Sequence, residues 1–398
     1  MTQPLLSVVV PTCNRVGPLL VALRSDTAQA CRLTKLVIGD DSQEHSTECP
    51  NSHRYSEGVL TNRFNVNSGV RNSRLYRHAR GLFRRVYPHV VRDTTPPSDV
   101  VVVMGKGRSG TTWLSEIINY RRDHRYLFEP FTHSRRFSET PLCRGFGDNR
   151  GYTRPESSDA DRYDVASAIL GGRSKDSVPD AYNRGLLYNR RIIKDISCLL
   201  YLPWLLRWFP EHKWVLLVRN PLATAASQAK YQWRYASSAD YQDDHELVAD
   251  HLHPFMPLIA EIDAAPSFDR AVLSWAIAYR VLVDSGVLTN PRCHVVHYEE
   301  LLTDTGVLDE LFRFLGRDDV ERARPHLSRQ SKTTWRSQPG DASRTLDGGA
   351  TPDQHLAAER ILQAFGFGRA YDHDGKPVQE AWRALAAAGK SRRPDSVV

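Results

Sequence analysis

Short continuous apolar runs, typical of buried strands, alternate along most of this chain with segments of helical apolar spacing. Apolar runs at 100–104 and 213–218 end in glycine or polar residues, as in strands buried on both faces. Each run is followed by a segment in which apolar residues recur with helical spacing. A further short strand is expected at 293–297, and helices are expected over 246–262, 268–287 and 353–366. This alternation predicts an α/β protein with a central parallel sheet.

The first part of the chain predicts a smaller unit of its own. Residues 6–11 read as a strand, 17–31 as a helix and 35–41 as a second strand, which is typical of a parallel βαβ unit. From Arg71 onward, arginines recur every three or four residues and share one face of an expected helix. That face is either solvated or binds a polyanion.

The composition changes again after residue 92. Residues 93–98 contain two consecutive prolines, which predict a linker. Residues 144–190 are rich in glycine and charge and predict loops. The expected organisation is a small unit at 1–92, a main domain at 99–388 and a disordered tail at 389–398.

Composition narrows the class of protein and its partners. The chain of 398 residues has 53 lysines and arginines against 46 acidic residues, and a net charge of +7 favours anionic ligands. Its six cysteines are scattered, without the C-x-x-C spacing of zinc sites, which predicts a reduced, cytoplasmic protein. We find no signal peptide and no apolar run long enough to span a membrane.

The segment VVVVMGKGRSGTTWL, which starts at Val100, carries the strongest chemical signal. A buried strand, a glycine-rich turn and a helix start in succession are typical of a phosphate-binding loop. Gly105 and Gly110 have P-loop spacing, but Thr111 replaces the lysine that grips a γ-phosphate. A plain strand–helix turn is the structural alternative. We therefore expect a P-loop-like three-layer α/β/α fold whose anion-binding residues are Lys106, Gly107, Arg108, Ser109, Gly110, Thr111, Thr112 and Trp113.

A second strand end carries a related signal. The strand at 213–218 is followed by Arg219, and Pro221 opens the next helix, with Ser227 two turns further on. Arg219 and Ser227 can reach the same anion as the first loop. The structural alternative is a surface arginine and a helical serine without a binding role. Two strand-end anion sites in one sheet fit a nucleotide with two separated phosphate groups.

Together, RSGTTW and VRNPLATAAS resemble the sulfotransferases that use 3′-phosphoadenosine 5′-phosphosulfate (PAPS). The resemblance covers about 98–370 and extends, more weakly, to the motifs at 127–131, 193–195 and 296–301. It implies that Arg108 through Trp113 face the phosphosulfate, and that Arg219 and Ser227 face the 3′-phosphate. It also implies that adenosine 3′,5′-bisphosphate (PAP) is the product and that no metal is needed.

The resemblance further suggests which residues act on the acceptor. Transfer to an alcohol needs a base, and the glutamate of LFEPF, Glu129, is the first candidate, with His133 as the alternative. Arg108 is expected to stabilise the charge that grows in the transition state, and Lys194 is a second candidate for this role. A structural ion pair is the other explanation for Glu129, and an ordinary lysine at a strand end is the other explanation for Lys194.

The start of the chain has a resemblance of its own. SVVVPTCNR and LVIGDDS are similar to the opening of family-two glycosyltransferases, in which residues matching Asp40 and Asp41 contact a nucleotide-sugar. The space before residue 99 is too short for that whole domain, so we expect a truncated unit that docks or helps to bind a sugar.

The expected function is transfer of a sulfuryl group from PAPS to a hydroxyl of a sugar-bearing or other small-molecule acceptor. A P-loop small-molecule kinase and a polyanion-binding protein are the alternatives. No nucleic-acid partner is expected, and the sequence leaves the oligomeric state open.

Overall fold

The computed structural model describes residues 7–9, 20–22, 87, 90–131, 151–174, 179–183, 185–230, 235–328 and 349–391. The chain divides into two compact units, Met1–Val86 and Tyr87–Val398. The second unit starts before the boundary that the prolines suggested. The expected strand at 35–41 and the arginine-rich stretch from Arg71 to Arg85 lie outside the described residues.

Two short strands are described in the first unit. β1 (Ser7–Val9) pairs antiparallel with β2 (Leu20–Ala22). The predicted helix over 17–31 is therefore wrong at Leu20–Ala22. A short apolar run such as LLVAL fits either a strand or a buried helix, and periodicity alone does not separate them.

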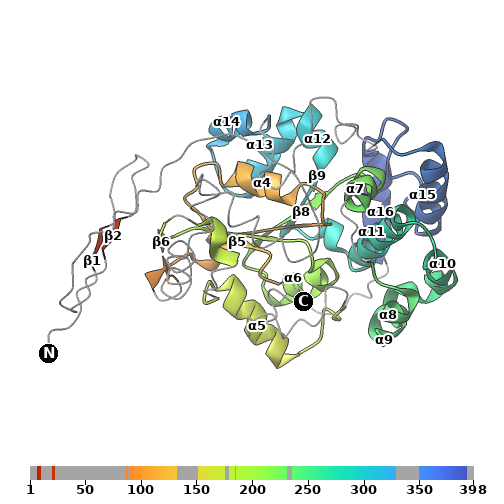
Figure 1. Cartoon of the computed structure of the whole chain (residues 1–398), viewed down its shortest axis with the longest axis horizontal. Coiled ribbons are helices and arrows are strands. Elements are labelled where there is room, and N and C mark those ends of the chain that lie inside the picture. The colour runs from red at the N-terminus through yellow and green to blue at the C-terminus, as the bar shows by residue number, and fades with distance from the viewer. Residues whose placement is uncertain are drawn as a thin grey trace, which may run out of the picture. The chain divides into compact units, whose positions relative to one another are not determined.

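A five-stranded parallel sheet forms the centre of the second unit, and this confirms the predicted α/β fold (Figure 1). The strand order is β5-β7-β4-β8-β9, and every neighbouring pair is parallel. A second, two-stranded parallel sheet joins β3 (Arg92–Asp93) and β6 (Leu187–Tyr188). The strands of the central sheet are β4 (Val100–Gly105), β5 (Arg125–Phe128), β7 (Arg191–Asp195), β8 (Lys213–Val218) and β9 (Cys293–His297).

Helices cover both faces of this sheet. The α-helices are α4 (Thr111–Ile118), α5 (Ala160–Leu170), α6 (Leu202–Trp208), α7 (Pro221–Ala229), α8 (Ser238–Gln242), α9 (His245–Leu247), α10 (Met256–Ile262), α11 (Ser267–Asp284), α12 (Tyr298–Thr303), α13 (Thr305–Phe314), α14 (Val320–Ala323), α15 (Pro352–Ala364) and α16 (Gln379–Ser391). The helix predicted over 246–262 is broken into α9, a π-turn, a 3₁₀ turn and α10. α16 continues to Ser391, so residues 389–391 of the expected disordered tail are helical.

β4 shows how the sequence builds the three layers. Its side chains are all buried and alternate between the two faces, as the twofold period of a strand requires. Val100, Val102 and Met104 pack in one core with α6, α7 and α11. Val101 and Val103 pack in another core with α4 and α13. In Figure 1, α4 and α12–α14 lie on one side of the sheet, and α5 and α6 lie on the other.

The strand order fixes where a ligand can bind. From β4 the chain runs to β5 and β7 on one side of the sheet, and later to β8 and β9 on the other side. The carboxyl end of β4 is therefore a topological switch point, where connections leave in opposite directions. Open α/β sheets bind their ligands in the crevice at such a point.

A buried ion-pair network connects β3 to the amino-terminal ends of β5 and β7. Asp93 accepts a hydrogen bond from Arg191 Nε at 2.8 Å and one from Arg125 Nη1 at 3.1 Å. Arg125 also pairs with Asp180, and all four side chains are almost fully buried. Asp93 thus belongs to the packed unit, although the sequence places it in a linker.

Candidate functional site

The glycine-rich turn after β4 forms an open anion cradle. Gly110 is the N-cap of α4, has a left-handed φ of 97° and supplies no side-chain cap to the first-turn N–H groups. Ser109 Oγ donates to the Lys106 carbonyl oxygen at 2.5 Å, so it stabilises the turn instead of capping the helix. Helix geometry leaves the first N–H groups without a partner, and they favour an anion.

Arg108 lies at the tip of this turn, in a conformation that is unusual for its type. It has a φ of 72°, in the left-handed region that favours glycine. Its Nε donates to Ser227 Oγ on α7 at 3.1 Å. Such backbone strain is often found at functional sites, where the surrounding structure holds it in place.

The second predicted loop meets the first one directly. Arg219 Nη1 donates to the Arg108 carbonyl oxygen at 2.9 Å, and Gln228 Nε2 donates to the Gly107 carbonyl oxygen at 2.7 Å. The Asn220 side chain caps α7 by accepting from two backbone N–H groups, and Pro221 fills the first helical position. The structure therefore joins Arg108, Arg219 and Ser227 in one site.

Two aromatic residues without a predicted role, Tyr298 and Trp275, lie beside Arg219. The Arg219 guanidinium lies 4.6 Å from the centroid of the Tyr298 ring, and Trp113 meets the same ring edge-on at 5.2 Å. Trp275 Nε1 donates to the Arg219 carbonyl oxygen at 3.0 Å. The position of Tyr298, directly after the strand that pairs with β8, is the signal that could have identified it.

The Glu299 carboxylate stabilises the turn between β8 and α7, which contains Arg219 and Asn220. It accepts from the Asn220 backbone N–H at 2.8 Å and is 1 % exposed. Burial raises its pKa to about 7. Glu299 thus holds the residue that follows Arg219.

Glu129 and Lys194 form an ion pair at the ends of the neighbouring strands β5 and β7. Glu129 adopts a left-handed φ of 50°, and its N–H donates to the Lys194 carbonyl oxygen at 2.6 Å. The Lys194 ammonium also lies 4.6 Å from the centroid of the Phe128 ring. The Glu129 side chain is 14 % exposed, and that of Lys194 is 4 % exposed.

Asp195 holds the turn that carries Glu129. Its carboxylate accepts from the N–H of Phe131 at 2.9 Å and from that of Ser197 at 2.8 Å. Burial, together with the nearby Glu129 charge, raises the pKa of Asp195 to about 6. The other predicted base, His133, lies outside the described residues.

The Lys106 side chain contacts α11. Its Nζ donates to Ser274 Oγ on α11 at 2.7 Å. Desolvation lowers the pKa of this ammonium to about 8. Lys106 and Arg108 thus bond to two helices that pack together, α11 and α7.

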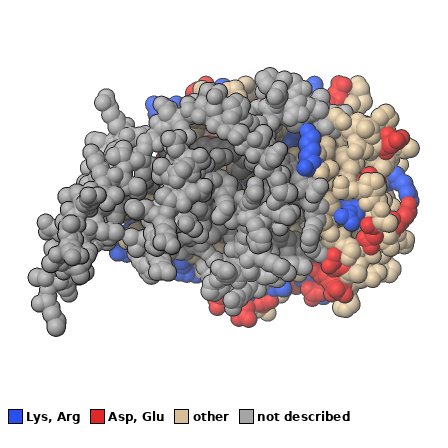
Figure 2. Space-filling view, viewed as in Figure 1, with Lys and Arg blue, Asp and Glu red and all other residues tan. Residues whose placement is uncertain are grey.

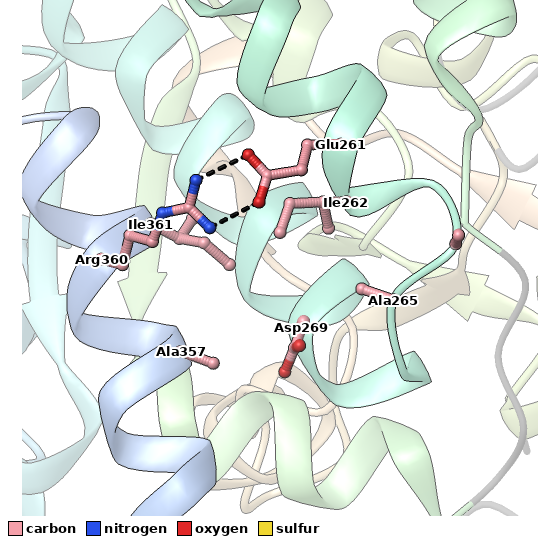
Figure 3. A pocket seen from close by; sticks show the side chains of 8 residues that line it. Glu261, Ile262, Ala265, Asp269, Ala357, Arg360 and Ile361 are labelled. Carbon is pink, nitrogen blue, oxygen red and sulfur yellow. Dashed lines mark hydrogen bonds and ion pairs between the residues drawn. The ribbon is translucent and has the colours of Figure 1, made fainter.

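A separate cavity of about 340 Å³ lies between α10, α11 and α15 (Figure 3). Glu261 and Arg360 bridge it with a bidentate ion pair, and Asp269 and several alanines line the rest. It contains none of the predicted site residues. In Figure 2, both acidic and basic side chains are visible on the described surface at the right.

Among the described residues, no group of three or more His, Cys, Asp or Glu side chains is placed to hold a metal ion. No helix within those same residues has both the length and the apolar character needed to cross a bilayer.

Replacing Gly110 with alanine should weaken anion binding at this loop. A Cβ there would lie 2.9 Å from the Tyr298 ring, and the φ of 97° would be strained as well. Gly316, with a φ of 67°, is the matched control, since its Cβ would meet nothing closer than the Lys213 ammonium at 3.5 Å. Calorimetric titration with PAP should show weaker binding in Gly110→Ala than in Gly316→Ala. Equal binding in the two variants would contradict a close approach at Gly110.

Comparison with known proteins identifies the family of this chain. The profile of a sulfotransferase family matches residues 100–321, more than half of the chain. No curated protein matches the sequence. Among solved structures, mouse sulfotransferase SULT7A1 complexed with PAP has 15% identity and a TM-score of 0.37, with 78% of this chain and 94% of that one covered. Sulfotransferase STF1 from Mycobacterium tuberculosis has 16% identity and a TM-score of 0.35, with 79% and 91% covered. The chain belongs to the sulfotransferase family.

Proposed function

We propose that this protein transfers a sulfuryl group from PAPS to a hydroxyl of a small-molecule acceptor, and that the acceptor carries a sugar. The hydrogen bond between Arg108 and Ser227 is the observation that carries the proposal. It joins two anion loops from neighbouring parallel strands, which is the arrangement that a nucleotide with two separated anionic ends requires. Similar proteins crystallised with PAP support the same donor.

The residues around the cradle fit such a donor. The first-turn N–H groups of α4 and the hydroxyls of Thr111 and Thr112 would hold the phosphosulfate, with Arg108 at its edge. Arg219 and Ser227 would hold the 3′-phosphate. Thr111 in place of the P-loop lysine supports a donor without a γ-phosphate.

Glu129 is proposed as the base that takes the acceptor proton. PAPS supplies the sulfuryl group, whose bond to the phosphate oxygen breaks as the bond from the acceptor oxygen to sulfur forms. The Glu129 carboxylate receives the hydroxyl proton, and Lys194 is its ion-pair partner. Arg108 and the loop N–H groups stabilise the negative charge on the departing phosphate.

Two buried free thiols, Cys198 and Cys293, support a reducing compartment such as the cytoplasm. The small unit predicted at 1–92 is proposed to help bind the acceptor, in line with the resemblance of its first segments to the opening of family-two glycosyltransferases.

Replacing Arg108 with alanine is expected to weaken PAP binding by about tenfold to a hundredfold, the value of one or two charge-assisted hydrogen bonds. Arg383→Ala on α16 is the control, because Arg383 is an exposed arginine outside the two loops. Isothermal titration calorimetry of both variants measures the effect. Unchanged affinity in Arg108→Ala would remove Arg108 from the donor site.

The direct test is incubation with PAPS and a panel of hydroxylated acceptors, read by mass for the gain of one sulfate. We expect sulfation of at least one sugar-bearing acceptor without added metal. Heat from ATP with magnesium, and none from PAP, would favour a kinase and overturn the proposal.

A further inference from the structure

A hairpin at 371–377 contacts the turn that presents Arg219. The Asn220 side chain donates through Nδ2 to the Gly375 carbonyl oxygen at 3.2 Å. Through Oδ1, the same side chain accepts from two backbone N–H groups at the start of α7. One side chain therefore connects the hairpin to the helix that carries Ser227 and to the residue that follows Arg219.

Asn220 is also held by its backbone. Its N–H donates to the Glu299 carboxylate at 2.8 Å, and both residues are buried. A close-packed interior leaves little room for a side chain to move without its neighbours. A displacement of the Gly375 carbonyl oxygen is thus expected to shift Asn220, and the turn with it.

Aromatic packing anchors the hairpin beside the same turn. Trp275 Nε1 on α11 donates to the Arg219 carbonyl oxygen at 3.0 Å. The Trp275 ring meets the Tyr371 ring edge-on at 6.5 Å and the Trp382 ring of α16 edge-on at 6.4 Å. Helix α11 packs against both α7 and α16, which lie near it in Figure 1. The hairpin and the Arg219 turn therefore share one packed core around Trp275.

The hairpin has its own internal order. The Asp372 carboxylate accepts from the N–H groups of Asp374 and Lys376 at 3.0 and 2.8 Å, and the Asp372 N–H donates to the Lys376 carbonyl oxygen at 2.9 Å. Gly375 has a left-handed φ of 79°, which glycine adopts without strain. An aspartate that bonds to the backbone two residues on stabilises a tight reversal of the chain.

Resting on the proposed function, we propose that Asn220 is a positioning residue through which the hairpin at 371–377 orients Arg219 and the start of α7 for the 3′-phosphate of the donor. Order in the hairpin and donor binding then stabilise each other. This coupling is reciprocal: if the ordered hairpin strengthens PAP binding by some factor, bound PAP reduces opening of the hairpin by the same factor. The hairpin lies beyond residues 100–321, which the family profile matches.

Hydrogen–deuterium exchange of the full chain, with and without saturating PAP, measures this coupling. Exchange of the peptide that contains residues 371–378 reports how often the hydrogen bonds of the hairpin open. We expect PAP to slow this exchange about fivefold, which is the lower end of typical coupling between two sites. Helix α5, which carries none of the proposed donor residues, is the internal standard and should exchange at an unchanged rate.

Asn220→Ser separates the link to the hairpin from the cap of α7. A serine hydroxyl can still cap the helix, but it is too short to reach the Gly375 carbonyl oxygen. We expect PAP affinity, measured by calorimetry, to fall about fivefold, and the protection of the hairpin by PAP to fall below about twofold. Asn290→Ser, in the turn before β9, is the matched control and should change neither value.

Asp372→Ala is a second probe, on the exposed side of the hairpin. It removes the acceptor of two hydrogen bonds and should weaken PAP binding by about twofold to fivefold. Asp374→Ala removes the same charge from the same hairpin, but the Asp374 carboxylate pairs with the exposed His373 ring at 3.3 Å. Its PAP affinity should therefore equal that of the parent protein.

Three results would overturn the proposal. Unchanged hairpin exchange when the parent protein binds PAP would show that the hairpin and the donor site are not coupled. Full protection in Asn220→Ser would remove Asn220 as the link, and equal PAP affinities in Asp372→Ala and Asp374→Ala would remove the role of the hairpin. A parent protein that binds no PAP at all gives a different answer, since it refutes the proposed function itself.

Discussion

Glutamine at position 129 is expected to lower kcat by about 10²- to 10⁴-fold while PAP still binds with its original affinity. The amide has nearly the shape of the carboxylate and can still accept a hydrogen bond from Lys194, so the turn at residue 129 is kept. It cannot take the acceptor proton. The loss should therefore appear in turnover and not in donor binding. Single-turnover sulfation assays and calorimetry with PAP measure the two quantities separately.

Glu310→Gln is the matched control for this experiment. Glu310 lies on α13, is exposed, and undergoes the same chemical change outside the site. Its turnover should equal that of the parent protein. Full activity in Glu129→Gln would leave the Glu129–Lys194 pair with a structural role and would direct attention to His133 as the base.

Asparagine at position 93 is expected to destabilise the main unit by about 3–5 kcal/mol. The Asp93 side chain is 1 % exposed and contacts both Arg125 and Arg191. The substitution keeps the size of the side chain but removes its charge. Both buried guanidiniums would then lose the charge of this carboxylate, while Asp180 would still pair with Arg125. The shift of the urea midpoint, followed by circular dichroism, measures the loss.

Asp99→Asn provides the comparison for this variant. Asp99 is exposed in the turn directly before β4, so the same substitution removes a charge without emptying a buried pair. Its midpoint should stay close to that of the parent protein. Equal midpoints for the two variants would show that the buried network contributes no net stability.

Three strands of the central sheet were predictable because their signals are local. Each of β4, β8 and β9 is a short apolar run, and a helix start follows each within a few residues. The anion loop after β4 was predictable for the same reason, since its glycines and the start of α4 are adjacent in sequence. The contact between Arg108 and Ser227 was expected only in outline, because it depends on two strands being neighbours in the sheet.

Other features depend on tertiary contacts and escaped prediction. α5 forms in a region expected to be loops, where Asp159 caps the helix and Ile169 and Leu170 anchor it in the core. Tyr298, Trp275 and Ser274 reach the site from segments far along the chain. The contact between Lys106 and α11 could not be predicted either, because the sequence of a loop does not show which helix packs against it.

The Asp93 clamp also bears on how the protein can be divided for expression. A fragment cut at the proline-rich stretch, beginning at residue 99, would discard the carboxylate and leave Arg125 and Arg191 short of compensation in the interior. A fragment that begins just before Tyr87 keeps it, together with the small apolar cluster of Tyr87, Val91 and Tyr188. The start of a workable truncation is thus set by one buried acid and not by the prolines that follow it.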